Sequence, residues 1–203
     1  LMGGTPIARH FRATDSQMIE DILRFRVNAL VITPRSGSNK GGSLEDLLSE
    51  DPDFLRKAGI KALIVSSTPL TEELLEEVRM QGVEFIVNFY GSTEALPDAA
   101  SCEHAPTHFH ITQGPNYVEV VDADGRHVGS GERGLVAVSR IGSMSESGIR
   151  PAEGSQIFRL LVGDEATYDA SPCPCGRLSA RIYDVKRVQN IEEKLSGGCE
   201  RWE

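Results

Sequence analysis

Three stretches in the first part of the chain place apolar side chains at the three- and four-residue spacing of an amphipathic helix. They are residues 15–26, 44–58 and 71–81. Asp15 or Ser16 can cap the first helix. Thr71 can cap the third, where Glu72 and Glu73 put negative charge at the positive helix end. The pattern therefore predicts three helices, each with one apolar face, and Pro52 is a place where the second can be interrupted.

Short runs rich in apolar and β-branched residues alternate with these helices. They are residues 28–34, 61–65 and 85–87. Strands and helices that alternate with short connections indicate a parallel sheet with right-handed crossovers. The Gly/Ser-rich segment 35–43 is expected to be a connecting loop, because its spacing does not fit the Gly-x-x-x-x-Gly-Lys-Ser loop that binds phosphate.

The pattern changes after residue 110, where short strands with glycine turns replace the helices. Residues 117–122 and 135–139 read as strands, with an Asp-Gly hairpin turn after the first. The expected fold class is α/β, with a mainly parallel sheet and flanking helices followed by a small antiparallel β-barrel or sandwich subdomain. The expected divisions are 1–97 for the α/β subdomain, 98–180 for the β-rich subdomain and 181–203 for a C-terminal tail.

Polar turns follow two of the predicted parallel strands. They span residues 66–70 and 88–94, and in an α/β sheet the carboxyl ends of strands are where ligands bind. The second turn presents an aromatic ring, hydroxyls and a carboxylate together. A ring can stack on a base, a hydroxyl can hold a phosphate oxygen, and a carboxylate can hold Mg²⁺. The same residues are also compatible with a strand that ends in a polar turn without a ligand.

Composition narrows the class of protein. The 203 residues are 39% hydrophobic and carry a formal net charge of 21 − 30 = −9, which argues against nucleic acid or an anionic membrane as partner. No apolar stretch approaches the roughly 20 residues of a membrane helix, and the first residues lack the features of a signal peptide. We therefore expect a cytoplasmic protein, and an oligomer is compatible with this composition.

The cysteines form a second candidate site. Cys173 and Cys175 are separated by one residue in a turn with proline and glycine, and Cys102 is followed by three histidines at 104, 108 and 110. Three cysteines and one histidine are a common ligand set for structural zinc. The alternative is that the thiols are unligated and lie at the surface. A cytoplasmic location makes disulfides the weaker explanation.

The segment Tyr90-Gly91-Ser92-Thr93-Glu94 resembles the Tyr-Gly-x-Thr-Glu signature of the adenylate-forming enzymes, which include acyl-CoA synthetases, adenylation domains and luciferases. Residues 63–70 and 117–136 are similar to further segments of that family. The resemblance implies that ATP and an aryl or acyl carboxylic acid form an acyl-adenylate and pyrophosphate. The acyl group is then transferred to CoA or to another thiol or amine.

The resemblance also implies roles for individual residues. The backbone of Ser67 and Thr68 would lie beside the adenine, the Asn88 amide on its edge and the Tyr90 ring on its face. Thr93 would contact the α-phosphate and Glu94 would bind Mg²⁺. The other residues implied to bind the nucleotide are Phe89 and Gly91 in the turn, Asp164 on the ribose hydroxyls, and Arg181 in a segment similar to the family's Gly-Arg-x-Asp-Asp hinge.

The segment Cys173-Pro174-Cys175-Gly176-Arg177 resembles the phenylacetate–CoA ligase branch of this family, some members of which bind zinc. The resemblance implies a structural zinc bound by the three cysteines and one histidine. Phe109-His110-Ile111 is similar to the branch's Leu-His-Ile and favours His110, whereas a tighter loop favours His108.

The resemblance covers most of the chain but not a whole enzyme. It implies a phosphate-gripping loop before residue 1, and a C-terminal domain with a catalytic lysine and a CoA tunnel after residue 203. This chain is therefore expected to be the second half of the large domain of such an enzyme. The alternative function is a zinc-stapled, catalytically degenerate nucleotide-binding module or partner-docking subunit.

Overall fold

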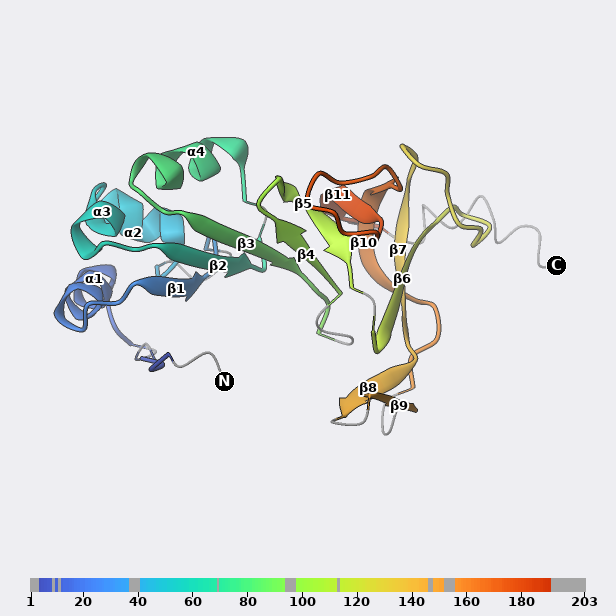
Figure 1. Ribbon diagram of the computed structural model, residues 1–203, viewed down its shortest axis with the longest axis horizontal. Coiled ribbons are helices and arrows are strands. Elements are labelled where there is room, and N and C mark those ends of the chain that lie inside the picture. Colours follow the sequence, from blue (N-terminus) through green and yellow to red (C-terminus); the bar gives the residue numbers. More distant parts are fainter. Residues whose placement is uncertain are drawn as a thin grey trace. The chain divides into compact units, whose positions relative to one another are not determined.

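The computed structural model describes residues 4–8, 10, 12–36, 41–68, 70–93, 98–112, 114–145, 148–151 and 156–190, without the side chains of 143–145 and 149–151. The chain divides into two compact units, Leu1–Ile86 and Val87–Glu203. Each unit is described by itself, and Figure 1 labels the elements of both. The end of the first unit lies within strand β3, Phe85–Tyr90.

The first unit contains all the helices of the described residues and the parallel strands. Its elements are α1 Asp15–Arg24, β1 Ala29–Ile32, α2 Leu44–Glu50, α3 Phe54–Ala58, β2 Ala62–Ser66 and α4 Glu72–Met80. Strands β1 and β2 pair in parallel, with Leu30 opposite Leu63. The helical stretch 44–58 is interrupted next to Pro52, where the chain leaves the helical conformation at Asp51–Asp53, so that it forms the two helices α2 and α3.

Helix α1 is capped one residue earlier than the sequence pattern suggests. Thr14 Oγ1 accepts a hydrogen bond from the Gln17 backbone N–H, and the Gln17 side chain accepts one from the Thr14 N–H. This reciprocal capping box satisfies two backbone donors at once, which neither Asp15 nor Ser16 does. Thr71 caps α4 as predicted.

Apolar side chains of helices and strands form the core of the first unit. Phe54, Leu55, Leu63 and Val65 are among its most completely buried members. The alternation of buried and exposed residues along β1 leaves Val31 exposed. The helical apolar faces predicted from the sequence therefore pack on the parallel strands.

The second unit is an antiparallel sheet in the order β3-β4-β5-β11-β10-β7-β6. Its further strands are β4 Ala99–Cys102, β5 Ala105–Ile111, β6 Asn116–Val121, β7 Arg133–Arg140, β10 Leu160–Asp169 and β11 Arg181–Arg187. A separate hairpin pairs β8 Gly142–Ser145 with β9 Gly148–Pro151. The mixed α/β class with flanking helices is as predicted. The expected barrel is not formed, because β6 pairs only with β7 among the described strands and leaves the sheet open.

Valine side chains from β6 and β7 fill much of the core of the second unit, together with Ala166 and Ile182. At Gly134 a side chain would collide with β6, because a Cβ atom there would lie 2.4 Å from the Val121 carbonyl oxygen. Gly134, in strand β7, is thus required by the close approach of two strands.

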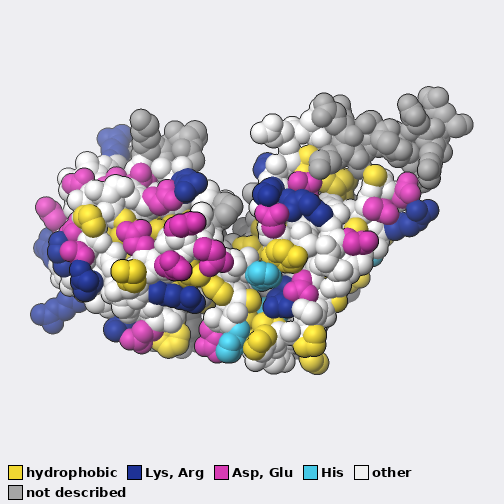
Figure 2. Space-filling view, turned by 90° about the horizontal axis from the view of Figure 1, so that it is seen from above, with side chains coloured by type: hydrophobic (Ala, Val, Ile, Leu, Met, Phe, Trp, Pro, Cys, Tyr) yellow, Lys and Arg dark blue, Asp and Glu magenta, His cyan; other side chains and the backbone are white. Residues whose placement is uncertain are grey.

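None of the helices in the described part of the chain is long and apolar enough to cross a membrane. On the face shown in Figure 2, acidic side chains of the described residues gather near the middle of the left-hand unit, with basic side chains around them.

Candidate metal centre and nucleotide-binding residues

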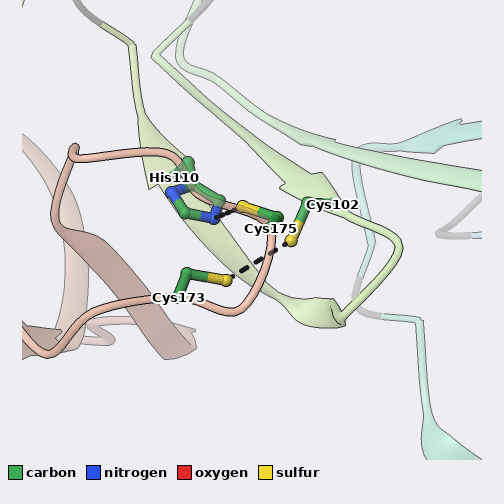
Figure 3. Close-up of side chains that lie close together, drawn as sticks. All are labelled: Cys102, His110, Cys173 and Cys175. Atoms are coloured by element: carbon green, nitrogen blue, oxygen red, sulfur yellow. Dashed lines mark hydrogen bonds between the residues drawn. The ribbon is translucent and has the colours of Figure 1, made fainter.

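Cys102, His110, Cys173 and Cys175 come together in the second unit (Figure 3). Their ligand atoms all lie within 4.8 Å of one another. Cys102 Sγ is 3.7 Å from Cys173 Sγ, and Cys175 Sγ is 3.4 Å from His110 Nε2. Cys102, Cys173 and His110 are buried, and Cys175 is partly buried. The cluster thus has the donor set of a closed structural zinc site.

The spacing of these atoms fits a zinc ion. Two sulfurs bound to a tetrahedral zinc at about 2.3 Å lie about 3.8 Å apart, and a sulfur and a nitrogen lie about 3.5 Å apart. The observed Cys102–Cys173 and Cys175–His110 distances, 3.7 and 3.4 Å, agree with this geometry. Thiolates and imidazole also select zinc over the oxygen-preferring ions Mg²⁺ and Ca²⁺.

Strand pairing brings the two parts of the cluster together across 71 residues of sequence. Strand β5 places His110 opposite Ala100 of β4 on one side and opposite Arg181 of β11 on the other. Cys173 and Cys175 lie in the connection between β10 and β11. That connection turns where the Gly176 N–H donates to the Cys173 carbonyl, and Gly176 has a φ of +80°, which favours glycine.

The His110 ring is oriented for binding through Nε2. Its Nδ1 lies 3.2 Å from the carbonyl oxygen of Ser179, so a proton on Nδ1 can be donated there, leaving the Nε2 lone pair directed at the cysteines. Burial lowers the pKa of His110, which keeps the imidazole neutral, the form that binds metal. Burial raises the pKa of Cys102; for Cys173 burial is outweighed by hydrogen bonds from Cys175, and its pKa is lowered.

His108 does not join the cluster. Its ring stacks on the Tyr183 ring at a centroid distance of 4.5 Å. Of the two histidines that the sequence left open, the structure therefore brings His110 to the three sulfurs.

A second polar group joins β3, β10 and β11. The Tyr90 hydroxyl donates to Asp164 Oδ2 at 2.8 Å, and Arg187 Nη1 donates to Asp164 Oδ1 at 3.0 Å and to the Val162 carbonyl at 2.7 Å. Burial and the Asp164 carboxylate raise the pKa of Tyr90 above its ordinary value. Tyr90 therefore stays a neutral hydrogen-bond donor at neutral pH.

Asn88, Phe89 and Tyr90, which the sequence pattern placed in a turn, belong to strand β3, and buried polar groups hold this strand and the residues directly after it. The Asn88 N–H donates to Ser101 Oγ at 2.8 Å, and the Ser92 N–H donates to Asp98 Oδ2 at 2.7 Å. Asp98 is completely buried. Ser92 Oγ is buried and has no hydrogen-bond partner among the described residues.

The other residues predicted to bind the nucleotide differ in how exposed they are. Phe89, Gly91 and Thr93 are exposed, and Glu94, the predicted Mg²⁺ ligand, lies outside the described residues. Ser67 and Thr68 belong to the first unit. Ser67 has a φ of +78°, and Thr68 Oγ1 accepts a hydrogen bond from the Arg35 backbone N–H at 3.0 Å.

Arg181 does not lie beside Asp164. In the β10–β11 pair, Arg181 stands opposite Asp169, whereas Arg187 stands opposite Asp164. Arg187 is the cation of this group that sequence reasoning missed. The sequence held one signal for Arg187, because it lies in the same segment of basic residues as Arg181. Which of the two arginines meets Asp164 depends on the register of β10 and β11, and that register depends on a β-bulge between Glu165 and Thr167.

The architecture is shared with several solved structures, two of which are CoA ligases. A 2-hydroxyisobutyryl-CoA ligase in complex with 2-HIB-AMP and CoA has a TM-score of 0.70 and 19% identity, covering 91% of this chain and 38% of that chain. A benzoate CoA ligase from Burkholderia xenovorans LB400 has a TM-score of 0.59 and 18% identity, covering 91% and 37%. ATP-bound MatB from Rhodopseudomonas palustris has a TM-score of 0.56 and 16% identity, covering 84% and 32%.

The sequence profile of the family described as AMP-binding enzyme matches residues 1–146, and the chain belongs to this family. A comparison with curated proteins finds no match. The chain spans 32% to 38% of the length of these three solved structures.

Proposed function

We propose that this chain is part of an ATP-dependent ligase that activates a carboxylic acid as its adenylate and then transfers the acyl group to CoA, as phenylacetate–CoA ligases do. The observation that carries the proposal is the group formed by Tyr90, Asp164 and Arg187 in a chain of the AMP-binding family. It combines an aromatic ring, a carboxylate and a cation, the three features needed for a base, a ribose and a phosphate.

Asp164 retains capacity for ribose in this arrangement. A carboxylate offers about four acceptor positions. Tyr90 and Arg187 each donate to one of its oxygens. The positions that remain suit the two vicinal hydroxyls of a ribose, and the Arg187 side chain is largely exposed, so that an anionic group can reach it.

The end of β3 and the residues after it would hold the rest of the nucleotide. The Tyr90 ring would lie on the adenine face, Asn88 on its edge and Thr93 on the α-phosphate. The role of Glu94 as Mg²⁺ ligand rests on the sequence motif alone. When bound, Mg²⁺ supplies positive charge that stabilises the phosphates during displacement.

The zinc that we propose for the cysteine cluster would be structural. Four protein ligands complete a tetrahedral zinc and leave no position for water. Cys102 and His110 come from the β4–β5 hairpin, and Cys173 and Cys175 from the β10–β11 connection. Bound zinc would therefore hold the hairpin that follows the Tyr90 turn against the strand pair that carries Asp164.

A second candidate is a nucleotide-binding module without turnover. It is favoured by Leu160-Leu161-Val162, which precede Gly163 and Asp164 where the family has Tyr-Arg-Thr. The arginine of the family's Tyr-Arg-Thr is therefore missing here, and with it one positive charge of the nucleotide site that the resemblance implies.

The two candidates differ in whether they form an adenylate. The test is ATP–pyrophosphate exchange by the complete protein, with a panel of aryl and aliphatic acids, followed by mass spectrometry for acyl-CoA. Acid-dependent exchange and a CoA thioester are expected for the ligase. Nucleotide binding without exchange for any acid would favour the module, and failure to bind ATP would contradict both.

A further inference from the structure

The Arg181 side chain is held in place by acceptors on one short segment. Its Nη2 donates to Asp169 Oδ2 at 2.6 Å, to Ser171 Oγ at 2.9 Å and to the Ser171 carbonyl at 3.3 Å. Arg181 is only 8% exposed. A buried guanidinium with these bonds is fixed, because breaking them would leave its charge without partners in a poorly solvated place.

These contacts lead directly to the metal ligands. Ser171 lies two residues before Cys173. Asp169 is the last residue of β10, and the connection that carries Cys173 and Cys175, here called the cysteine turn, begins directly after it. On its other side, Arg181 is the register partner of His110 in the β5–β11 pair. One side chain thus fixes the cysteine turn relative to the strand that bears the histidine.

The charge of the loaded centre also requires a cation. Zinc with three thiolates and a neutral imidazole has a net charge of about −1, and a buried charge is costly unless it is compensated. The Arg181 guanidinium supplies a buried positive charge close to the centre in the chain, because it is bonded to Ser171, two residues before Cys173. Arg181 Nε is buried and has no hydrogen-bond partner among the described residues, so the guanidinium retains a donor for added negative charge.

We propose that Arg181 is a positioning residue of the metal centre and not a ligand of the nucleotide. The inference rests on the proposed zinc site. It differs from the role that the family resemblance implies for Arg181, and it leaves the position beside Asp164 to Arg187.

The experiment compares two matched arginine variants of the complete protein, Arg181→Gln and Arg187→Gln. Zinc affinity is measured by competition with a chromophoric chelator, and ATP affinity by calorimetry. For Arg181→Gln we expect zinc affinity to fall by about 10- to 100-fold, as for other residues that orient metal ligands, with ATP affinity within about two-fold of the wild type. Arg187→Gln should show the reverse pattern. Cobalt substituted for zinc should give an altered absorption spectrum only in Arg181→Gln.

The possible failures are distinguishable. If the wild type binds no zinc, the proposed metal site is wrong and this inference falls with it. If the wild type binds zinc and Arg181→Gln binds it equally well, only the inference is wrong. Loss of ATP affinity with zinc affinity unchanged would also overturn the inference and restore the nucleotide role of Arg181.

Should Arg181→Gln not fold, the variants Ser171→Ala and Asp169→Asn keep the arginine and loosen its contacts. Weaker zinc binding in both would support the inference, and unchanged binding in both would contradict it.

Discussion

The Tyr90 hydroxyl donates a 2.8 Å hydrogen bond to Asp164 Oδ2, joining β3 to β10 across 74 residues of sequence. The two residues come from separate motifs that both point to a nucleotide, one to its base and one to its ribose. Because these two side chains, both proposed to bind the nucleotide, contact each other directly, each one fixes the orientation of the other.

Removing this hydrogen bond should lower stability. Tyr90→Phe keeps the ring but leaves the partly buried Asp164 carboxylate without one donor. A hydrogen bond to a charged group contributes about 1.5–3 kcal/mol, and we expect a decrease of that order in the free energy of unfolding. Urea denaturation of the variant measures it. Tyr117→Phe, at an exposed position of β6, is the matched control and should be close to neutral. Equal stability of the two variants would show that the bond contributes little.

Asp164→Ala should weaken ATP binding through the loss of the ribose contacts. A charge-assisted hydrogen bond of about 1.5–3 kcal/mol corresponds to about ten- to a hundred-fold in affinity. Calorimetric titration of the complete protein with ATP measures the change. Glu84→Gln, an exposed carboxylate of the first unit, is the control. If Asp164→Ala binds ATP with unchanged affinity, the Gly163-Asp164 segment is only a turn and does not bind the ribose.

Local pattern was sufficient for the helices and for several strands. The apolar spacing of 71–81 and the alternation of 117–122 agree with α4 and β6, because each element buries one face. Strands β4 and β5 were not expected, since their cysteine, histidines and proline obscure the alternation. Their structure depends on partners distant in sequence.

The choice between the two histidines shows what local sequence could not determine. His108 and His110 lie two residues apart on β5, so a strand directs both side chains to the same face. Only the pairing of β5 with β4 and β11 decides which ring reaches the cysteines. Arg181 and Arg187 pose the same problem on β11, where the register with β10 decides which arginine meets Asp164.

Glu94→Gln should leave the fold intact and remove most adenylation. The change keeps the size of the side chain and removes the charge proposed to hold Mg²⁺. Acid-dependent ATP–pyrophosphate exchange by the complete protein measures it, with thermal unfolding as the check on folding. Exchange at the wild-type rate would exclude Glu94 as the metal ligand.

Acid should destabilise the metal-free protein through His110. Burial lowers the folded-state pKa of this imidazole, while in the unfolded chain it titrates near its ordinary value of about 6.5. Below that pH the unfolded state binds the extra proton first, so stability falls as pH falls from about 6.5 toward the folded-state pKa. Urea unfolding from about pH 5 to 7.5 in the presence of chelator measures the slope. The His110→Gln variant should show a smaller slope, and an equal slope would contradict the assignment.

Loss of zinc should lower thermal stability first and activity only indirectly. The metal would join Cys102 to Cys173 across 71 residues, and closing a long loop restricts the unfolded chain strongly. At free zinc about a hundred times its Kd, binding stabilises the folded state by about 2.7 kcal/mol. For a chain of this size that corresponds to about 5–10 °C in Tm.

Cys173→Ser and chelator treatment should therefore lower Tm by similar amounts, and their effects should not add, because both remove the same ion. Cys199→Ser is the matched control, since Cys199 is not among the predicted ligands, and it should retain one zinc per chain and the wild-type Tm. Metal analysis of protein purified without chelator provides the stoichiometry. Wild-type Tm in Cys173→Ser, or equal zinc in both cysteine variants, would show that the cluster does not hold a stabilising metal.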